Sequence, residues 1–248
     1  MITLFRRIRE KLIASGSVTK YLLYAVGEIL LVVVGILIAL QVNNWNEEKT
    51  RQKQEQVILD EIISDLKESE ATIAKELIPD MNSSNVAQCI KSISILNDHM
   101  QQGLPYADSL DMHFTSIFSY SDLAYKVSGY EMLKSYGFDY IRDPELRKSI
   151  GIYYTTIVPR TRNDFDDVRD DFYSYMLDYL RKEFNTVFIE KYGDRNLYIP
   201  IRYEDLMQDS EFIQTLNVYR DIQEQYLYSL KSTLKETRDL LALIDRKR

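Results

Sequence analysis

A single carboxylate inside a long apolar run is the feature of this sequence with the clearest chemical meaning. The run extends from Leu22 to Val42, and its polar members are Tyr24, Glu28 and Gln41. A carboxyl group in a membrane-spanning helix is costly and normally faces protein or water rather than lipid. Three roles stay open for Glu28. It could hydrogen-bond in a neutral form or reach toward the headgroups, it could clamp a partner span or its own copies, or it could relay protons or ions.

The residues around Glu28 predict a helix-packing seam. Ala25, Glu28, Val32, Gly35 and Ala39 are separated alternately by three and four positions, so they share one helix face. Gly35 and Ala39 are small residues four positions apart, which lets two helix backbones approach closely in a membrane. We therefore expect this seam to contact another span, from a partner protein or from a second copy.

Acidic side chains also gather on one predicted helix, but without the pattern of a metal site. Asp164, Asp167 and Asp171 share a helix face beside the apolar stripe of Phe165 and Phe172. Calcium binds about 6–8 oxygen atoms, many of them from a loop, and no EF-hand pattern is present. We expect a solvated helix face here and no metal ion.

The sequence contains no recognisable catalytic motif. Its two histidines, His99 and His113, fall in separate predicted elements, and there is no zinc motif and no Gly-rich phosphate loop. We therefore assign no catalytic residue and no cofactor, and we expect that the protein is not an enzyme. The alternative is an enzyme whose serine or aspartate nucleophile and histidine base are not apparent from the sequence.

Tyrosine is abundant, with 19 residues, and the only cysteine is Cys89. Most tyrosines of the middle third sit at core spacing, so we expect core packing, with an aromatic-lined pocket or a protein interface as alternatives. Cys89 lies at helical spacing from Val86 and Ile93, which predicts a buried, unreactive thiol. The tyrosines concerned are Tyr136, Tyr140, Tyr153, Tyr154, Tyr173, Tyr175 and Tyr179.

The apolar run is long enough to cross a membrane once. A helix that rises about 1.5 Å per residue crosses a hydrocarbon core of roughly 30 Å in about 20 residues. A cleaved signal peptide is the alternative, but its apolar core is usually about 7–15 residues. We expect an uncleaved signal anchor in the bacterial inner membrane.

Basic residues before the run predict its orientation, because such residues stay on the cytoplasmic side. The N-terminus is then cytoplasmic and the C-terminal domain periplasmic. Met1, Phe5, Ile8 and Leu12 recur at helical spacing, as in a short amphipathic helix on anionic lipid; a plain basic flank is the alternative. The expected membrane-interface anchors are Arg6, Arg7, Arg9, Lys11, Lys20, Tyr21 and Trp45.

The residues around the span form a dense pattern. Its parts are FRRIR at 5–9, KYL at 20–22, GEI at 27–29, GILIALQ at 35–41 and NNWNE at 43–47. This pattern resembles that of a family of uncharacterised bacterial single-span membrane proteins, classed as a domain of unknown function. Looser similarity extends to residues 128–130, 137, 143–146 and 153–154. The resemblance implies a fold and a location, and it implies no activity.

Charge and composition narrow the possible partners. The net charge is −7, and residues 1–21 carry +4, so residues 22–248 carry −11. An acidic outer domain argues against nucleic acid or anionic lipid as its partner. Glycine (8) and proline (5) are few, which disfavours a turn-rich all-β fold.

Four segments are predicted: a cytoplasmic basic segment 1–21, a transmembrane helix 22–42, a juxtamembrane helical stalk 43–57 and a periplasmic helical-bundle domain 58–248. Apolar stripes predict a helix that ends at Pro79 and further helices near 84–101, 110–118, 128–137, 144–157 and 210–245. The last of these has coiled-coil-like spacing, and we expect it to run back along the stalk helix. The fold class is all-α, an antiparallel helical bundle on one membrane helix.

Local signals refine these boundaries. Ser128 to Glu131 has the pattern of a capping box, and Asp143 with Pro144 that of a capped helix start. Pro159 should kink or split the helix that contains it. Residues 196–203 are the only plausible extended piece, and we expect a loop there.

These features favour a bitopic membrane protein that acts by assembly. It would be a homo-oligomeric scaffold or an accessory subunit of an inner-membrane complex. Its partners would be the lipid bilayer and either further copies of itself or another membrane protein. One alternative is a periplasmic ligand sensor, of unknown ligand, that signals through a partner protein. Another is an ion- or proton-coupled membrane component that uses Glu28.

Overall fold

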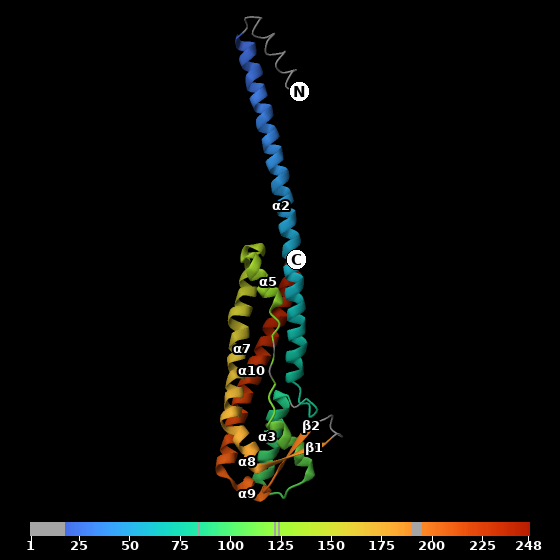
Figure 1. The fold of residues 1–248 in the computed structure, drawn as a ribbon, viewed down its shortest axis with the longest axis vertical. Helices are drawn as coiled ribbons and strands as arrows, with labels where there is room; N and C mark the ends of the chain where they lie inside the picture. The colour runs from blue at the N-terminus through green and yellow to red at the C-terminus, as the bar shows by residue number, and fades with distance from the viewer. Residues whose placement is uncertain (1–17, 84, 122, 124, 190–194) are drawn as a thin grey trace. The chain divides into compact units, whose positions relative to one another are not determined.

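The computed structural model describes residues 18–83, 85–121, 123, 125–189 and 195–248 (Figure 1). These residues are mostly helical, as the sequence predicts. The chain divides into two compact units, Met1–Gln56 and Val57–Arg248, and the first is described from Val18 onward. Helix α2 (Val18–Glu76) contributes residues to both units.

Helix α2 changes character along its length. Residues 22–42 carry apolar side chains all around the helix, interrupted by Tyr24, Glu28 and Gln41. The stretch from Ile58 to Ile73 has its apolar stripe on one face. The helix ends at Glu76, close before Pro79, as predicted. The one-sided stripe is buried in the second unit, where its members Ile58, Leu59, Ile62, Leu66 and Ile73 are at most 4% exposed.

Two predicted helices follow α2. Helix α3 (Val86–Gln101) begins behind Asn85, whose side chain accepts a hydrogen bond from the backbone N–H of Gln88 at 2.9 Å. It ends just before Gly103, whose φ of +58° favours glycine. A short 3₁₀ turn, η1 (Asp108–Leu110), then leads into helix α4 (Asp111–Ile117).

Helices α5 (Ser128–Tyr136) and α6 (Pro144–Ile152) also lie where the sequence predicts them. Helix α5 ends at Gly137, which has a φ of +106°, and the 3₁₀ turn η2 (Phe138–Tyr140) follows. The predicted cap of α6 is confirmed, because Asp143 Oδ1 accepts a hydrogen bond from Leu146 N at 2.9 Å.

Helix α6 continues through two π-helical turns. The first turn, η3 (Tyr153–Ile157), leads into α7 (Val158–Asp171), and the second, η4 (Phe172–Met176), leads into α8 (Leu177–Glu183). In η3 the amide of Val158 donates to the carbonyl of Tyr153, five residues earlier. The predicted irregularity at Pro159 therefore takes the form of a widened turn just before the proline, which has no N–H to donate.

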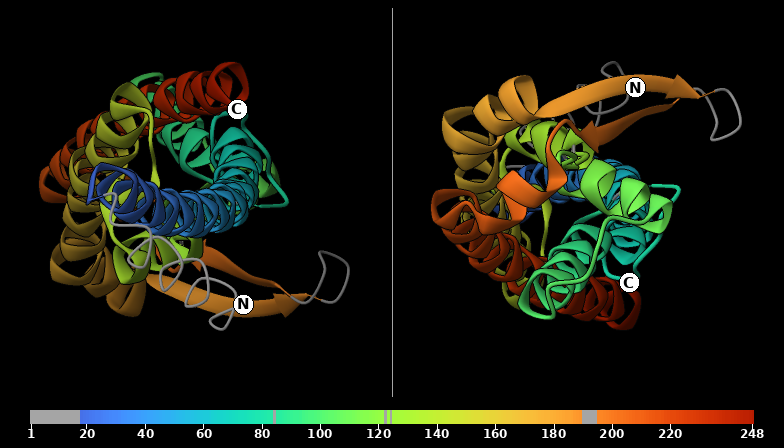
Figure 2. Two further views of the ribbon diagram at one scale, coloured as in Figure 1. Left: turned by 90° about the horizontal axis from the view of Figure 1, so that it is seen from above. Right: turned by 90° about the horizontal axis from the view of Figure 1, so that it is seen from below.

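The loop that we expected over residues 196–203 is wrong, and so is an all-α fold in this region. Strands β1 (Phe184–Ile189) and β2 (Arg195–Pro200) form an antiparallel hairpin in which Val187 lies opposite Leu197. Strand β1 is rich in β-branched and aromatic residues, which suit a pleated surface, and β2 adds Tyr198 and Ile199. Helix α4 packs against β2, and Thr115 Oγ1 accepts a hydrogen bond from Tyr198 N at 3.1 Å. Figure 2 shows the hairpin beside the helices.

The chain ends with α9 (Tyr203–Gln208) and the long helix α10 (Ser210–Lys247), which Asp209 caps. Helix α10 packs against α7, α3 and α6, and Figure 1 shows α7 and α10 side by side. Two ion pairs place the end of α10 beside α2 within the second unit. Arg238 Nε lies 2.6 Å from Glu70 Oε1, and Arg248 Nη1 lies 2.7 Å from Asp60 Oδ1.

The described residues of the second unit form two hydrophobic cores. One joins α3, α4, α7, α9, α10 and β1, and it includes Phe114, Phe212 and Tyr219. The other joins residues 58–66 of α2 to α5, α6, η3 and the end of α10, and it includes Ile62 and Ile244. Each half of the unit is therefore held together by its own buried side chains.

Candidate functional site

The apolar part of α2 exposes its side chains around the helix. Between Leu22 and Val42 the large apolar side chains are from 44% to 71% exposed. By length and composition, α2 is long and apolar enough to cross a membrane. Burying so many apolar side chains is favourable in either lipid or protein, so the helix needs an apolar surrounding.

The predicted seam occupies one side of this helix. Ala25 and Glu28 are half-buried, whereas Val32 and Ala39 are exposed. A Cβ atom added at Gly35 would meet no other atom within 4 Å. The seam is thus open enough for the backbone of another helix to approach at Gly35.

The predicted interface anchors are described only in part. Trp45 is 65% exposed, and Lys49 Nζ lies 5.3 Å from the centroid of its ring. Lys20 and Tyr21 belong to α2, and nothing is described of their side chains. The remaining anchors and the amphipathic segment lie outside the described residues: Arg6, Arg7, Arg9 and Lys11.

A buried carboxylate, Asp65, joins α2 to the start of α5. Its Oδ2 atom accepts a hydrogen bond from Gly129 N at 2.8 Å, and its Oδ1 lies 2.7 Å from Ser128 Oγ. Ser128 Oγ is also 2.9 Å from Glu61 Oε1. Asp65 is only 4% exposed, so these contacts satisfy a carboxylate that water barely reaches.

The predicted capping box is therefore wrong. Ser128 is the first helical residue of α5, and no side chain of the segment itself caps the helix. The expected partner, Glu131, instead pairs with Lys134, whose Nζ lies 2.7 Å from its carboxylate. Asp65, which is distant in the chain, accepts the hydrogen bond at the start of α5 instead. Local sequence patterns do not contain this contact. One signal was available: an acid directly beside the apolar stripe of α2.

Gly129 completes this joint because it lies directly against the backbone of α2. A Cβ atom at this position would lie 2.5 Å from Ile62 N and 2.8 Å from Ile62 Cα. Such distances are far below a normal contact, so only glycine allows the observed approach of α5 to α2. Asp65, Ser128, Gly129 and Ile62, which we call the Asp65 joint, thus define the position of α5.

The tyrosines of the middle third do not form one site. Tyr153 and Tyr154 are buried, as predicted, and Tyr153 Oη lies 2.8 Å from Thr237 Oγ1. Burial raises the pKa of Tyr153 to about 12 and also raises that of Tyr154. The expectation of core packing is wrong for Tyr136, Tyr173 and Tyr175, which are 47%, 57% and 58% exposed.

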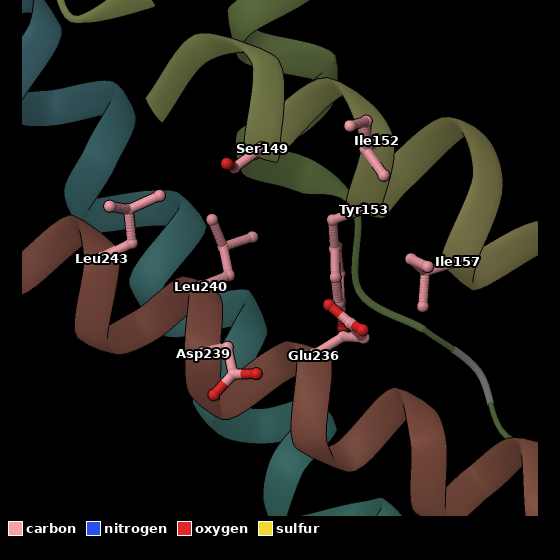
Figure 3. A pocket seen from close by; sticks show the side chains of 8 residues that line it. All are labelled: Ser149, Ile152, Tyr153, Ile157, Glu236, Asp239, Leu240 and Leu243. Carbon is pink, nitrogen blue, oxygen red and sulfur yellow. The ribbon is translucent and has the colours of Figure 1, made fainter. Parts of the chain in front are cut away.

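A small cavity of about 210 Å³ lies beside Tyr153, between η3 and α10. Figure 3 shows Ile152, Tyr153 and Ile157 on one helix facing Leu240 and Leu243 on the other. Two acidic side chains, those of Glu236 and Asp239, complete the α10 side. This cavity is smaller than the roughly 300–1,000 Å³ of typical ligand sites.

The acidic run of α7 does not assemble into one cluster. Asp164 accepts a hydrogen bond from Ser229 Oγ, Asp167 is exposed, and Asp171 is half-buried with a raised pKa caused by burial. Among the described residues, no three His, Cys, Asp or Glu side chains are placed to hold a metal ion. The carboxylates thus act separately.

One serine and one histidine do come together. His113 Nδ1 lies 3.1 Å from Ser92 Oγ, which also accepts a hydrogen bond from Gln88 Nε2 at 2.9 Å. Burial and the nearby Lys91 lower the pKa of His113, which favours a neutral ring. Ser92 is fully buried, however, so a substrate has no access to its hydroxyl.

The remaining sequence candidates lie apart from these residues. His99 Nε2 is 2.9 Å from the carbonyl oxygen of Pro105. Cys89 is buried, as predicted, and burial raises the pKa of its thiol to about 12. A thiol with so high a pKa is unreactive at neutral pH.

The described residues thus define a mostly helical protein with one helix that is long and apolar enough to span a membrane. Residues 28–98 match a family described as a family of unknown function (DUF6090). The matched segment begins at Glu28 and includes the rest of α2, with Asp65, and most of α3. Neither the curated proteins nor the solved structures contain a match to this chain.

Proposed function

We propose that this protein is a single-pass membrane protein that acts by assembly, either as a homo-oligomeric scaffold or as an accessory subunit of a bacterial inner-membrane complex. Residues 22–42 would span the membrane, with the N-terminus in the cytoplasm. Residues 58–248 would form a periplasmic antiparallel helical bundle. The pairing of Arg248 with Asp60 and of Arg238 with Glu70 supports the antiparallel course of α10 beside α2.

One observation carries the proposal: the seam on α2 places two small residues, Gly35 and Ala39, four positions apart on one exposed face. Gly35 has no neighbour within 4 Å of a Cβ position, and Ala39 is the next small residue on that face. Close backbone approach is the main source of packing between membrane helices, since lipid tails are as apolar as leucine. A second span can therefore pack here more closely than lipid can.

Glu28 gives this contact its specificity. A carboxylate in a span is costly in lipid and normally faces protein or water, so a protein partner is expected on the side of Glu28. The helix would then prefer one rotational setting, with Glu28 facing the partner.

Disulfide cross-linking in membranes tests the proposed contact. Val32 and Val33 are adjacent valines with similar exposures of 54% and 47%, but only Val32 belongs to the seam. The Val32→Cys variant of the full-length protein should form a cross-linked species under mild oxidation, and Val33→Cys should not. Cys89 is buried and does not compete.

A second pair of variants tests the role of close approach. Both Gly27 and Gly35 have open space around a Cβ position, but only Gly35 lies on the seam. Gly35→Leu should abolish the Val32→Cys cross-link, or the recovery of a partner protein in a pull-down. Gly27→Leu should leave both the cross-link and the recovery intact. Equal cross-linking at Val32 and Val33, or indifference to Gly35→Leu, would refute an assembly seam on this face.

A further inference from the structure

One cleft of the second unit has the size of a small-ligand site. It has a volume of about 570 Å³ and lies where α3, the end of α9 and α10 meet. Ligand sites typically have about 300–1,000 Å³. Its lining combines amide, charged and apolar side chains, and the six that matter for binding are Asn97, Asp98, Met100, Met207, Asn217 and Arg220.

A pair of asparagines offers the cleft a matched donor and acceptor. Asn97 Nδ2 donates a hydrogen bond to Asn217 Oδ1 at 2.9 Å, so the pair bridges α3 and α10. This bond uses neither the Oδ1 acceptor of Asn97 nor the Nδ2 donor of Asn217. Both atoms can therefore bind a ligand. An amide group carries the complementary acceptor and donor, so the pair is suited to bind one amide of a peptide.

The charges around the cleft favour a cation. Asp98 lies in the lining and is exposed. Arg220 is the only basic residue of the lining, and it is already opposed by two acids. Its Nη2 lies 3.2 Å from Asp221 Oδ1, and its Nε lies 3.6 Å from Glu224 Oε1. An ammonium group near Asp98 therefore meets a net negative surrounding, whereas a carboxylate would be repelled.

The remaining wall of the cleft is apolar and adaptable. Met100, Met207 and Ile213 are half-buried there. Methionine side chains are flexible and polarisable, so they accept apolar groups of different shape. An aliphatic side chain of a ligand can be buried on this wall.

We propose that this cleft binds the amino-terminal residue of a short peptide. The ligand's ammonium group pairs with Asp98, its first amide group hydrogen-bonds to Asn97 and Asn217, and its side chain packs on the methionines. This gives the second unit a recognition role that is independent of assembly through α2.

L-Leucinamide is the smallest probe with all three features. Added to the full-length protein in mild detergent, it should raise the melting temperature saturably and give a binding isotherm in calorimetry. N-acetyl-leucinamide lacks the ammonium group and should bind about tenfold more weakly or worse, because a charge-assisted hydrogen bond is lost. N-acetyl-leucine, which is anionic, should not bind.

Two variants link the binding to the named residues. Asp98→Asn and Asn217→Ala should each weaken leucinamide about tenfold, and the matched exposed controls Asp167→Asn and Asn163→Ala should bind like the wild type. Their melting temperatures without ligand show that they are folded. The proposal is overturned if leucinamide gives no saturable response, if N-acetyl-leucine binds equally well, or if neither variant changes the affinity.

Discussion

A methyl group at Gly129 should disrupt the Asp65 joint. In Gly129→Ala, the new Cβ would lie 2.5 Å from Ile62 N and 2.7 Å from Ile62 Cγ1. Because normal contacts of carbon are about 3.5–4.0 Å, α5 has to move about 1 Å away from α2. The hydrogen bond of 2.8 Å from Gly129 N to Asp65 Oδ2 is then broken or badly weakened.

The expected cost follows from three terms. Overpacking costs about 1–3 kcal/mol, and a lost hydrogen bond to a charged group costs about 1.5–3 kcal/mol. The better helix propensity of alanine offsets at most about 1 kcal/mol. The free energy of unfolding should therefore fall by about 1.5–5 kcal/mol, which lowers the melting temperature by roughly 3–20 °C.

Gly151→Ala is the matched control for this measurement. Gly151 lies within α6, and a Cβ atom there would meet nothing within 4 Å. This variant should be as stable as the wild type or more stable by up to about 1 kcal/mol. The assay is thermal unfolding of the full-length protein in mild detergent, followed by circular dichroism. Wild-type stability of Gly129→Ala, or an equal loss in both variants, would refute the argument from close approach.

Three further predictions concern the carboxylates. Asp65→Asn should lower the free energy of unfolding by about 1–3 kcal/mol, because it replaces a carboxylate that accepts from two donors by an amide. Chemical denaturation would measure this loss, and Asp167→Asn, at an exposed position, should be silent. Burial raises the pKa of Asp171 above its ordinary 3.8, so its charged form destabilises the fold. Asp171→Asn should therefore raise the melting temperature at neutral pH, and the gain should vanish below about pH 3.8; a gain that persists there contradicts this account. In a mild-detergent pull-down, Glu28→Gln should weaken recovery of the oligomer or partner while Gln41→Ala should not, and an unchanged complex would exclude the clamp.

Most helix boundaries were predictable because their signals are local. The stripes of α2, α3 and α10 follow the helical repeat, and the stops at Gly103 and Gly137 depend on the φ of single residues. Asp143 caps α6 from the adjacent position in sequence. Each of these signals acts within a few residues, so no knowledge of the fold is needed.

The hairpin was missed because strand pairing depends on partners outside the segment. Residues 184–189 carry no helical stripe, but their extended form depends on β2 and on the support that Thr115 gives to Tyr198. The sign in the sequence is the run of β-branched and aromatic residues at 184–189, followed by a possible turn at Gly193.

The candidate sites likewise divide into those that depend on local spacing and those that depend on the fold. The sequence alone determines the apolar length of α2 and the seam that contains Glu28, because helical spacing places those residues on one face. Only the tertiary structure brings Asp65 to Gly129, Ser92 to His113 and Asn97 to Asn217. These pairs are distant in the chain, and their hydrogen bonds depend on the packing of whole helices, which no local pattern encodes.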